Sequence, residues 1–246
     1  MIRINQLQKH FGDKTAVDIP DLFIGRGEII GLVGNNGAGK TTFFRLMLDL
    51  LKADHGSVVY SMPTEECLPS ESSIADVNPA VSEEWKHFTG AYLDDGFLID
   101  FLTPEEYFSF IGQTFGLDKE KIKERVDRFS SFTNWQESEQ KKLIRDFSAG
   151  NKQKIGIIAA MMGDPKVLLL DEPFNFLDPS SQNYLKKMIQ EYNARTHATI
   201  LVASHNLQHT IDISTRILLM ENGKIIRDQA NDNEEALREI NDYFNV

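Results

Sequence analysis

The sequence is poor in features that would place it among secreted, membrane-spanning or disulfide-stabilised proteins. Its only cysteine, Cys67, has no second thiol to pair with, which excludes a disulfide framework and a cysteine-rich metal site. The longest apolar stretch, IGIIAAMMG at 155–163, is far shorter than the roughly 18 residues that indicate a membrane-spanning helix. The first residues, MIRINQLQKHFGDK, lack the apolar centre of a signal peptide. We therefore expect a cytoplasmic protein that does not cross a membrane by itself.

Basic charge is also scarce. The formal net charge is −11, with 26 lysines and arginines against 37 aspartates and glutamates. Proteins that bind nucleic acids contact the phosphate backbone through clustered lysine and arginine, and no basic block or RNA-binding signature occurs here. The 41% of hydrophobic and 26% of charged residues are typical of a soluble globular protein. No nucleic-acid partner is expected.

The sequence does contain strand patterns on either side of a helical insert. Three β-rich apolar stretches, EIIGLVG, KVLLLDEP and ATILVASH, predict strands buried on both faces of a parallel sheet. Asn222 and Gly223 predict the turn of a hairpin within RILLMENGKII. TPEE at 103–106 predicts a helix start, with Thr103 as N-cap and Glu106 closing a capping box.

Further segments carry predictions of their own. Residues 61–84 are rich in proline, serine and glutamate and predict a surface loop. A second helix is expected from Asp118, with an apolar face, and NEEALREINDYF at 233–244 predicts a short amphipathic helix. Eight of the 16 phenylalanines lie between residues 94 and 147, where we expect them to form the core of a helical lobe.

Residues 34–41, GNNGAGKT, match the phosphate-loop pattern G-x-x-x-x-G-K-[ST] in full. The glycines permit a close backbone approach, so the loop's N–H groups point inward and the next helix adds the positive end of its dipole. Lys40 places a cation on the β- and γ-phosphates, and the Thr41 hydroxyl can ligate Mg²⁺. That next helix should carry a wide apolar stripe from Phe43 to Leu51. The loop residues expected to bind nucleotide are Asn35, Asn36, Gly37, Ala38, Gly39, Lys40, Thr41 and Thr42.

Two acidic residues and a histidine follow two of the predicted strands. Asp171 and Glu172 end VLLLDE, where ligands gather in open α/β sheets. Asp171 suits a direct or water-mediated Mg²⁺ contact, and Glu172 is placed to orient or deprotonate an attacking water. His205 ends TILVASH, where it could sense a γ-phosphate. Each residue alone is more often a helix cap or a structural hydrogen-bond partner. Beside a phosphate loop, a catalytic set of Lys40, Glu172 and His205 is favoured.

The stretch FSAGNKQKIGIIAAMMGDPKVLLLDEPFNFLDP, residues 147–179, resembles the signature, Walker B and D-loop run of ATP-binding-cassette (ABC) ATPases. The resemblance extends over nearly the whole chain, and the motifs come in family order. It implies an α/β fold: a P-loop NTPase core with a mixed sheet, an antiparallel β edge subdomain and an inserted α-helical lobe. The core would comprise 1–93 and 166–246, and the helical subdomain 94–165.

The same resemblance implies roles for further residues. Ser148 and Gly150 stand in the signature, where they would bind the phosphates of an ATP held by a second copy, in a head-to-tail dimer. Asp178 matches the D-loop aspartate, and Phe11 the aromatic that stacks on adenine, although a core position explains Phe11 equally well. Asp94 stands where glutamine is expected, with Asp95 the other candidate. An aspartate is shorter, so it reaches Mg²⁺ only through a closer backbone or a water.

Within this family we expect the ATP-hydrolysing subunit of a transporter whose membrane-spanning subunits are separate chains. The aspartate at 94 and SAGNKQK look more like ATPases of small exporters than of importers. ATP and Mg²⁺ are the expected cofactors, and the expected location is the cytoplasmic face of the membrane. A groove near Phe97, Phe101 and Phe108 would seat a helix of the membrane subunit, although a packed core explains the same residues. The alternative is a soluble assembly or scaffold ATPase, for example for iron–sulfur clusters, and a third class acts on nucleic acids.

Overall fold

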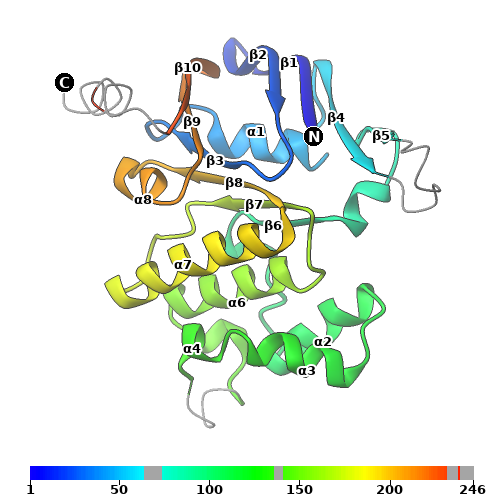
Figure 1. The fold of residues 1–246 in the computed structure, drawn as a ribbon, viewed down its shortest axis with the longest axis vertical. Helices are drawn as coiled ribbons and strands as arrows, with labels where there is room; N and C mark the ends of the chain where they lie inside the picture. Colours follow the sequence, from blue (N-terminus) through cyan, green and yellow to red (C-terminus); the bar gives the residue numbers. More distant parts are fainter. Residues whose placement is uncertain (64–73, 136–140, 232–237, 239–246) are drawn as a thin grey trace.

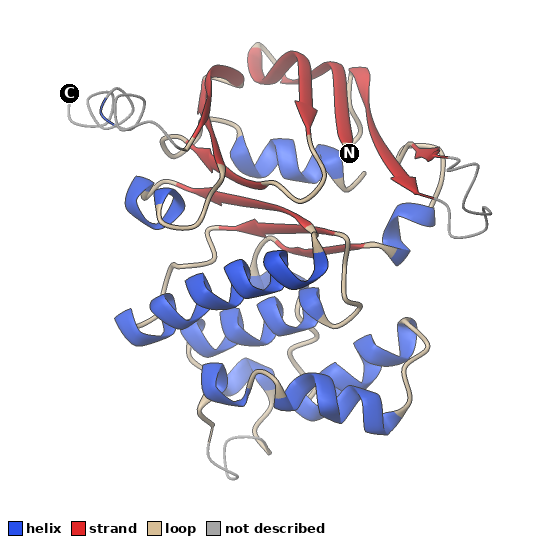
Figure 2. Cartoon of the chain, in the orientation of Figure 1, coloured by secondary structure: helices blue, strands red, loops and turns tan. Residues whose placement is uncertain are grey.

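Two β-sheets enclose one helix at one end of the protein, and a block of helices covers the other face of the larger sheet (Figure 1). The computed structural model describes residues 1–63, 74–135, 141–231 and 238. Figure 2 shows that the strands gather on one side of the molecule and most of the helices on the other. Among the described helices, none is long and apolar enough to cross a bilayer.

The larger sheet is mixed, with six strands in the order β10-β9-β3-β8-β7-β6. From β6 to β9 each strand is parallel to its neighbours, whereas β10 is antiparallel to β9. The smaller sheet is antiparallel, in the order β2-β1-β4-β5. The strands are β1 (Ile2–Phe11), β2 (Lys14–Ile24), β3 (Ile29–Val33), β4 (His55–Pro63), β5 (Ile74–Val77), β6 (Thr89–Tyr92), β7 (Val167–Asp171), β8 (Thr199–Ser204), β9 (Arg216–Glu221) and β10 (Lys224–Ala230).

Helix α1 lies between the two sheets, and α6 and α7 pack on the other face of the larger one, with α2, α3 and α4 beyond them (Figure 1). The helices are α1 (Lys40–Met47), α2 (Pro104–Thr114), α3 (Lys119–Asp127), α4 (Ser130–Thr133), α6 (Ala149–Met161), α7 (Pro179–Thr196) and α8 (Leu207–Ile211). Three 3₁₀ turns are η1 (Glu84–His87), η2 (Asp95–Phe97) and η3 (Ile144–Asp146).

The central strands are buried on both faces because alternate residues face two separate cores. Along β7, Leu168 and Leu170 contact the core beneath α6 and α7, whereas Leu169 contacts the core around α1. A strand that packs on both faces needs a continuous apolar run, and this is the pattern in KVLLLDEP. The predicted fold class is confirmed in its sheets and its helical block.

Local predictions from turn and cap chemistry are also confirmed. The hairpin β9–β10 turns at Asn222 and Gly223, whose φ angles are 47° and 81°, as a type I′ turn requires. Helix α2 begins with the full capping box: the Glu106 N–H donates to Thr103 Oγ1 at 3.3 Å, and the Thr103 N–H donates to Glu106 Oε2 at 2.8 Å. Asp118 caps α3, where its carboxylate accepts from the Lys121 N–H at 2.8 Å.

The prediction of a surface loop over 61–84 is wrong for residues 61–63 and 74–77, which are strands, whereas residues 78–83 form no helix or strand. Strand β4 continues to Pro63, and β5 at Ile74–Val77 pairs with it. The pairing sets Tyr60 opposite Val77, and both side chains are buried in the core around α1. The many serines and glutamates concealed this short alternating pattern. Residues 64–73 lie outside the described residues, as does most of the helix predicted at 233–244.

Two expectations about apolar side chains need correction. Helix α1 ends at Met47, because Asp49 adopts φ 49° and the Leu50 N–H donates back to the Arg45 carbonyl at 2.9 Å. Leu50 therefore leaves the predicted stripe and is 51% exposed. The phenylalanines between 94 and 147 also divide. Four are buried, but Phe97, Phe101 and Phe110 are exposed, so the lobe core does not include them.

Candidate functional site

The phosphate loop, residues 34–39, joins β3 to α1 and is pressed against neighbouring strands. A Cβ atom at Gly34 would collide with the Met220 carbonyl oxygen, and one at Gly39 with that of Ala16. Gly39 also adopts φ 112°, which side chains strongly disfavour. Helix α1 has no side-chain cap and no acidic residue in its first turn. Its first N–H groups and its dipole therefore favour an anion at this end.

Lys40 connects the loop to the catalytic carboxylate predicted from the sequence. Its side chain is buried, and Nζ donates to the Gly34 carbonyl at 2.6 Å and to the Asn35 carbonyl at 3.4 Å. Nζ also lies 3.5 Å from Glu172 Oε1. The lysine is thus held at the loop by three oxygen atoms, which keeps its charge beside the anion-binding end of α1.

Thr41 and Asp171 meet across the gap between α1 and the end of β7. Thr41 Oγ1 donates to Asp171 Oδ2 at 2.5 Å. Burial raises the pKa of Asp171 to about 6, and the nearby Glu172 charge adds to the rise against the opposing Thr41 hydrogen bond. Within the described residues, Asp171 Oδ1 is buried without a hydrogen-bond partner. A buried free carboxylate oxygen beside a hydroxyl fits the hard oxygen ligands that Mg²⁺ prefers.

Glu172 and His205 form one hydrogen-bonded unit at the ends of β7 and β8. The Glu172 carboxylate accepts from the His205 N–H at 2.9 Å, and His205 Nδ1 lies 2.9 Å from its other oxygen. Ser204 Oγ adds a longer contact of 3.4 Å. Glu172 adopts φ 47°, a left-handed conformation that is costly for a residue with a side chain. The Gln153 side chain donates to its carbonyl at 3.2 Å and helps to hold it there.

The signature residues stand at the start of α6, beside the D-loop. Ser148 caps α6, accepting from the Asn151 N–H at 3.4 Å. A side chain at Gly150 would press against the Phe176 carbonyl oxygen, so the glycine permits close contact between the two segments. Asp178 caps α7 through the N–H groups and hydroxyls of Ser180 and Ser181, and these bonds hold the pKa of its carboxyl well below the usual range.

Asp94 and Phe11 lie apart from this central group. The Asp94 carboxylate accepts from the Gly96 N–H at 2.9 Å and lies 3.4 Å from Arg45 Nη2 on α1. Phe11 is 52% exposed, with Lys9 Nζ 5.7 Å from its ring centroid, so the core interpretation of this residue is wrong.

The structure therefore brings together Lys40, Thr41, Asp171, Glu172 and His205. The first and the last of these are 165 residues apart in the sequence. Within the described residues, no hydrogen bond links Ser148 or Gly150 to the phosphate loop. Sequence reasoning missed Arg45 and Gln153. Arg45 follows Thr41 by four residues, so helical spacing could have placed both on one face.

Comparison with known proteins decides the family. The model of the ABC transporter family matches residues 17–175. The chain belongs to the ABC transporter family. It is 29% identical over 230 residues to the ABC transporter ATP-binding protein NatA of Bacillus subtilis, covering 92% of this chain and 88% of that protein. It is also 29% identical over 235 residues to the methionine import ATP-binding protein MetN of Clostridioides difficile, covering 96% of this chain and 70% of MetN.

Solved structures of ABC cassettes share the fold. The chain resembles the dimeric ATP-binding cassette MJ0796 bound to ADP and Pi, with a TM-score of 0.78, 18% identity, and coverage of 95% of this chain and 100% of that chain. The ATP-binding subunit of another ABC transporter gives a TM-score of 0.80 at 23% identity, covering 98% and 93%. This ABC chain is an ATPase.

We predict that Lys40→Ala lowers the rate of ATP hydrolysis by roughly a hundredfold or more, because the ammonium no longer stabilises charge on the γ-phosphate. ATP binding should weaken as well. Steady-state ATPase assays and circular dichroism test this, with the exposed Lys52→Ala as the matched control. A Lys40→Ala rate within a few-fold of the unmutated protein would contradict the assigned role.

Asp171→Asn should make the nucleotide-free protein more stable at neutral pH. The folded state raises the pKa of Asp171 from 3.8 to about 6, so its ionised form destabilises folding above that pH. The variant should gain about 2 kcal/mol at pH 7. As the pH falls from 6 towards 4, Asp171 is protonated in the folded state before it is protonated in the unfolded state. The burial penalty of its charge is then lost, so the stability difference between Asp171→Asn and the unmutated protein should shrink over that range.

Urea unfolding of both proteins with EDTA measures this difference. Both share every other carboxylate, so the change of the difference with pH reports Asp171 alone. A difference that stays constant from pH 7 to pH 4 would show that the Asp171 carboxylate carries no burial penalty.

Proposed function

We propose that this chain is the ATP-hydrolysing subunit of an ABC transporter, and that it works as a pair of identical cassettes attached to separate membrane-spanning subunits. The observation that carries the proposal is the position of Asp94. Through Arg45 it contacts the phosphate-loop helix, and it also lines an apolar groove beside η2. The nucleotide site and a candidate docking surface thus share one segment.

In the proposed reaction, Glu172 accepts a proton from the attacking water, and His205 holds the Glu172 carboxylate in position through its N–H and Nδ1. Lys40 stabilises the charge that develops on the γ-phosphate. Thr41 and Asp171 would hold Mg²⁺, which would neutralise charge on the β- and γ-phosphates. Asp94, which is already bonded to Gly96 and Arg45, would contact that ion through water.

The remaining nucleotide contacts complete the proposal. The loop backbone from Asn35 to Thr42 would surround the phosphates, and the exposed ring of Phe11 would stack on adenine. Ser148 and Gly150 would meet the γ-phosphate held by the second cassette. The start of α6 supports this, because its first turn carries no acidic residue. A dimer is described for the resembling cassette MJ0796.

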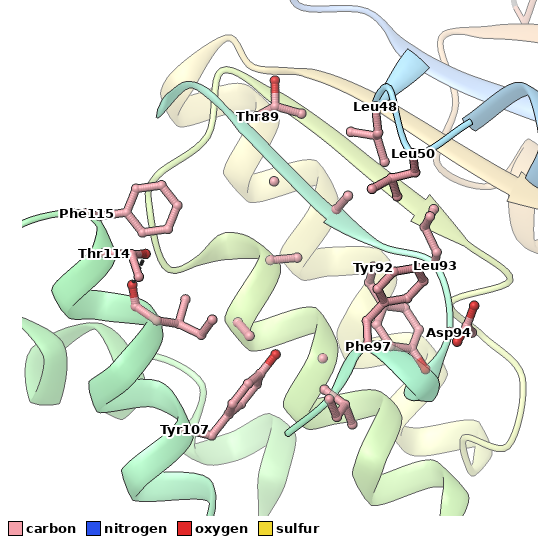
Figure 3. A pocket seen from close by; sticks show the side chains of 17 residues that line it. Leu48, Leu50, Thr89, Tyr92, Leu93, Asp94, Phe97, Tyr107, Thr114 and Phe115 are labelled. Atoms are coloured by element: carbon pink, nitrogen blue, oxygen red, sulfur yellow. Dashed lines mark hydrogen bonds between the residues drawn. The ribbon is translucent and has the colours of Figure 1, made fainter. Parts of the chain in front are cut away.

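The docking groove lies between β6, η2, α2 and α6 (Figure 3). It has a volume of about 270 Å³, and Leu50, Leu93 and Phe97 are among its apolar lining residues. Phe97 is 54% exposed, and Phe101, which does not line the groove, is 65% exposed, whereas Phe108 is buried and cannot contribute as the sequence suggested. An apolar groove with exposed aromatic rings suits an amphipathic helix of a membrane subunit. Membrane attachment, on the cytoplasmic face, would then depend on that subunit.

Asp94 and SAGNKQK resemble ATPases of small exporters, whereas one of the relatives described above is named for methionine import, so the proposal covers transport in either direction. The soluble assembly ATPase remains the alternative that an experiment must distinguish.

Glu172→Gln should retain ATP binding, stop turnover and accumulate as an ATP-dependent dimer, since an amide cannot accept the proton that hydrolysis releases. Size-exclusion chromatography with and without ATP measures the dimer. Glu105→Gln, an exposed change on α2, serves as the control and should stay active. A Glu172→Gln protein that elutes as a monomer in both conditions argues against self-pairing.

Membrane fractionation tests the transport role. When co-expressed with a candidate membrane subunit from a neighbouring gene, the chain should sediment with membranes, and Phe97→Asp with Phe101→Asp should release it. Phe23→Asp adds the same charge at an exposed phenylalanine on β2 and should have no effect. Recovery of the unmutated chain only in the soluble fraction, with the membrane subunit well expressed, would favour the assembly ATPase.

A further inference from the structure

A second cavity, which we call the α3–α7 pocket, lies away from the nucleotide site. It has a volume of about 360 Å³, and its lining comes from the end of α3, the segment around the end of α6, and α7. None of its lining residues belongs to the candidate site described above. Because a helix rises about 1.5 Å per residue, Arg195 in this pocket is roughly 25 Å from Asp178, which caps the opposite end of α7.

The floor of the α3–α7 pocket is apolar, and its aromatic rings are held in place. Tyr184, Met188 and Tyr192 recur at intervals of four residues along α7 and so share one face. The Tyr184 ring stacks on Phe132, with centroids 5.6 Å apart and planes 12° from parallel. Tyr192 Oη donates to the Pro165 carbonyl at 2.8 Å. Rings that are already ordered lose little conformational entropy when a ligand binds.

The rim of the pocket carries charge on a neighbouring face of the same helix. Lys187, Glu191 and Arg195 also recur at intervals of four residues. Within the described part of the chain, neither Lys187 nor Arg195 forms an ion pair. The Arg195 guanidinium lies over the Tyr192 ring, 5.6 Å from its centroid. Two cations are therefore available beside an aromatic floor.

On the other wall of the pocket, formed by the end of α3 and the segment after α6, the charged side chains already have partners. Arg125 donates to the Met162 carbonyl and forms an ion pair with Asp164 at 2.8 Å, so the Asp164 charge is compensated. Arg128 lines the pocket as well, and its partner Glu124 does not. Four cations and two carboxylates line the pocket, and with Glu124 counted the cations still exceed the carboxylates by one, in a chain whose net charge is −11. The local surplus of positive charge favours an anion.

We propose that the α3–α7 pocket binds a small aromatic anion, in which a flat apolar ring system carries one carboxylate or another oxyanion. The ring lies on the floor formed by Tyr184, Met188 and Tyr192, and the oxyanion meets Lys187 and Arg195. The pocket volume falls in the range of small-molecule sites. Glu191 stands between Lys187 and Arg195 on α7, and its negative charge weakens their attraction for the oxyanion. Removing that charge should therefore strengthen binding, whereas reversing the charge of Lys187 should weaken it.

The probe is 2-naphthoate, measured by isothermal titration calorimetry with saturating ADP so that the phosphate loop is occupied. We expect saturable binding that Lys187→Glu weakens roughly fivefold or more and that Glu191→Gln strengthens. Lys123→Glu makes the same charge reversal at an exposed lysine of α3 outside the pocket and should change the dissociation constant less than about twofold. Neutral 2-naphthol should bind the unmutated protein and Lys187→Glu equally.

Two results would overturn the proposal. One is the absence of saturable naphthoate binding to the unmutated protein. The other is equal binding by Lys187→Glu, Glu191→Gln and Lys123→Glu, with thermal melts showing that all three are folded. Phe97→Asp separates the α3–α7 pocket from the apolar groove beside η2. Loss of naphthoate binding in that variant would assign the site to the groove instead.

Discussion

The hydrogen bond between Thr41 and Asp171 joins two elements on which the nucleotide site depends. Thr41 stands in the first turn of the phosphate-loop helix, and Asp171 ends the buried strand β7. Neither position is free to move, because the loop is pressed against β9 and β2 on one side and β7 is paired on both edges. The burial that raises the pKa of Asp171 also leaves one of its oxygens without a protein partner. The proposed cation site therefore has a cost in stability of the free protein.

Glu172 also has an energetically unfavourable feature that its neighbours hold in place. Its left-handed backbone is unfavourable, but its peptide N–H donates to the Ala203 carbonyl at 2.8 Å and its carbonyl accepts from buried Gln153. These bonds fix the direction in which the carboxylate leaves the sheet, and His205 then restrains its oxygens. Strain that is held by several partners can orient a catalytic group without reorganisation during the reaction. Gln153 lies on α6, whose first turn is proposed to meet the second cassette, so one helix contacts Glu172 and carries that surface.

Short-range chemistry explains which features could be predicted from the sequence. Positive φ at Asn222 and Gly223, the cap at Thr103 and the glycine loop all depend on residues within a few positions of one another. The apolar strands were recognisable because burial on both faces removes polar alternation. Strand β5 was not, because its pairing with β4 depends on a distant partner. Phe97 and Phe108 illustrate the same limit: both are phenylalanines of the predicted helical lobe, and only tertiary packing leaves the first exposed and buries the second.

Asp94 makes one contact within its own turn, with Gly96, and one with a distant element, through Arg45 on α1. Sequence comparison with the family identified its position but not its partner, since Arg45 is distant in the chain and belongs to another element. The 3.4 Å ion pair connects η2 to α1, one helical turn beyond Thr41. Both side chains are partly exposed, so the pair is weak by itself and can be broken or remade at small energetic cost. A weak contact suits a segment proposed to respond to nucleotide, whereas the stronger bonds of Thr41, Asp171 and Glu172 suit groups proposed to stay in place. A shift of the Arg45 side chain would reach Phe97 through Asp94 and the three-residue turn Asp95–Phe97 that it caps.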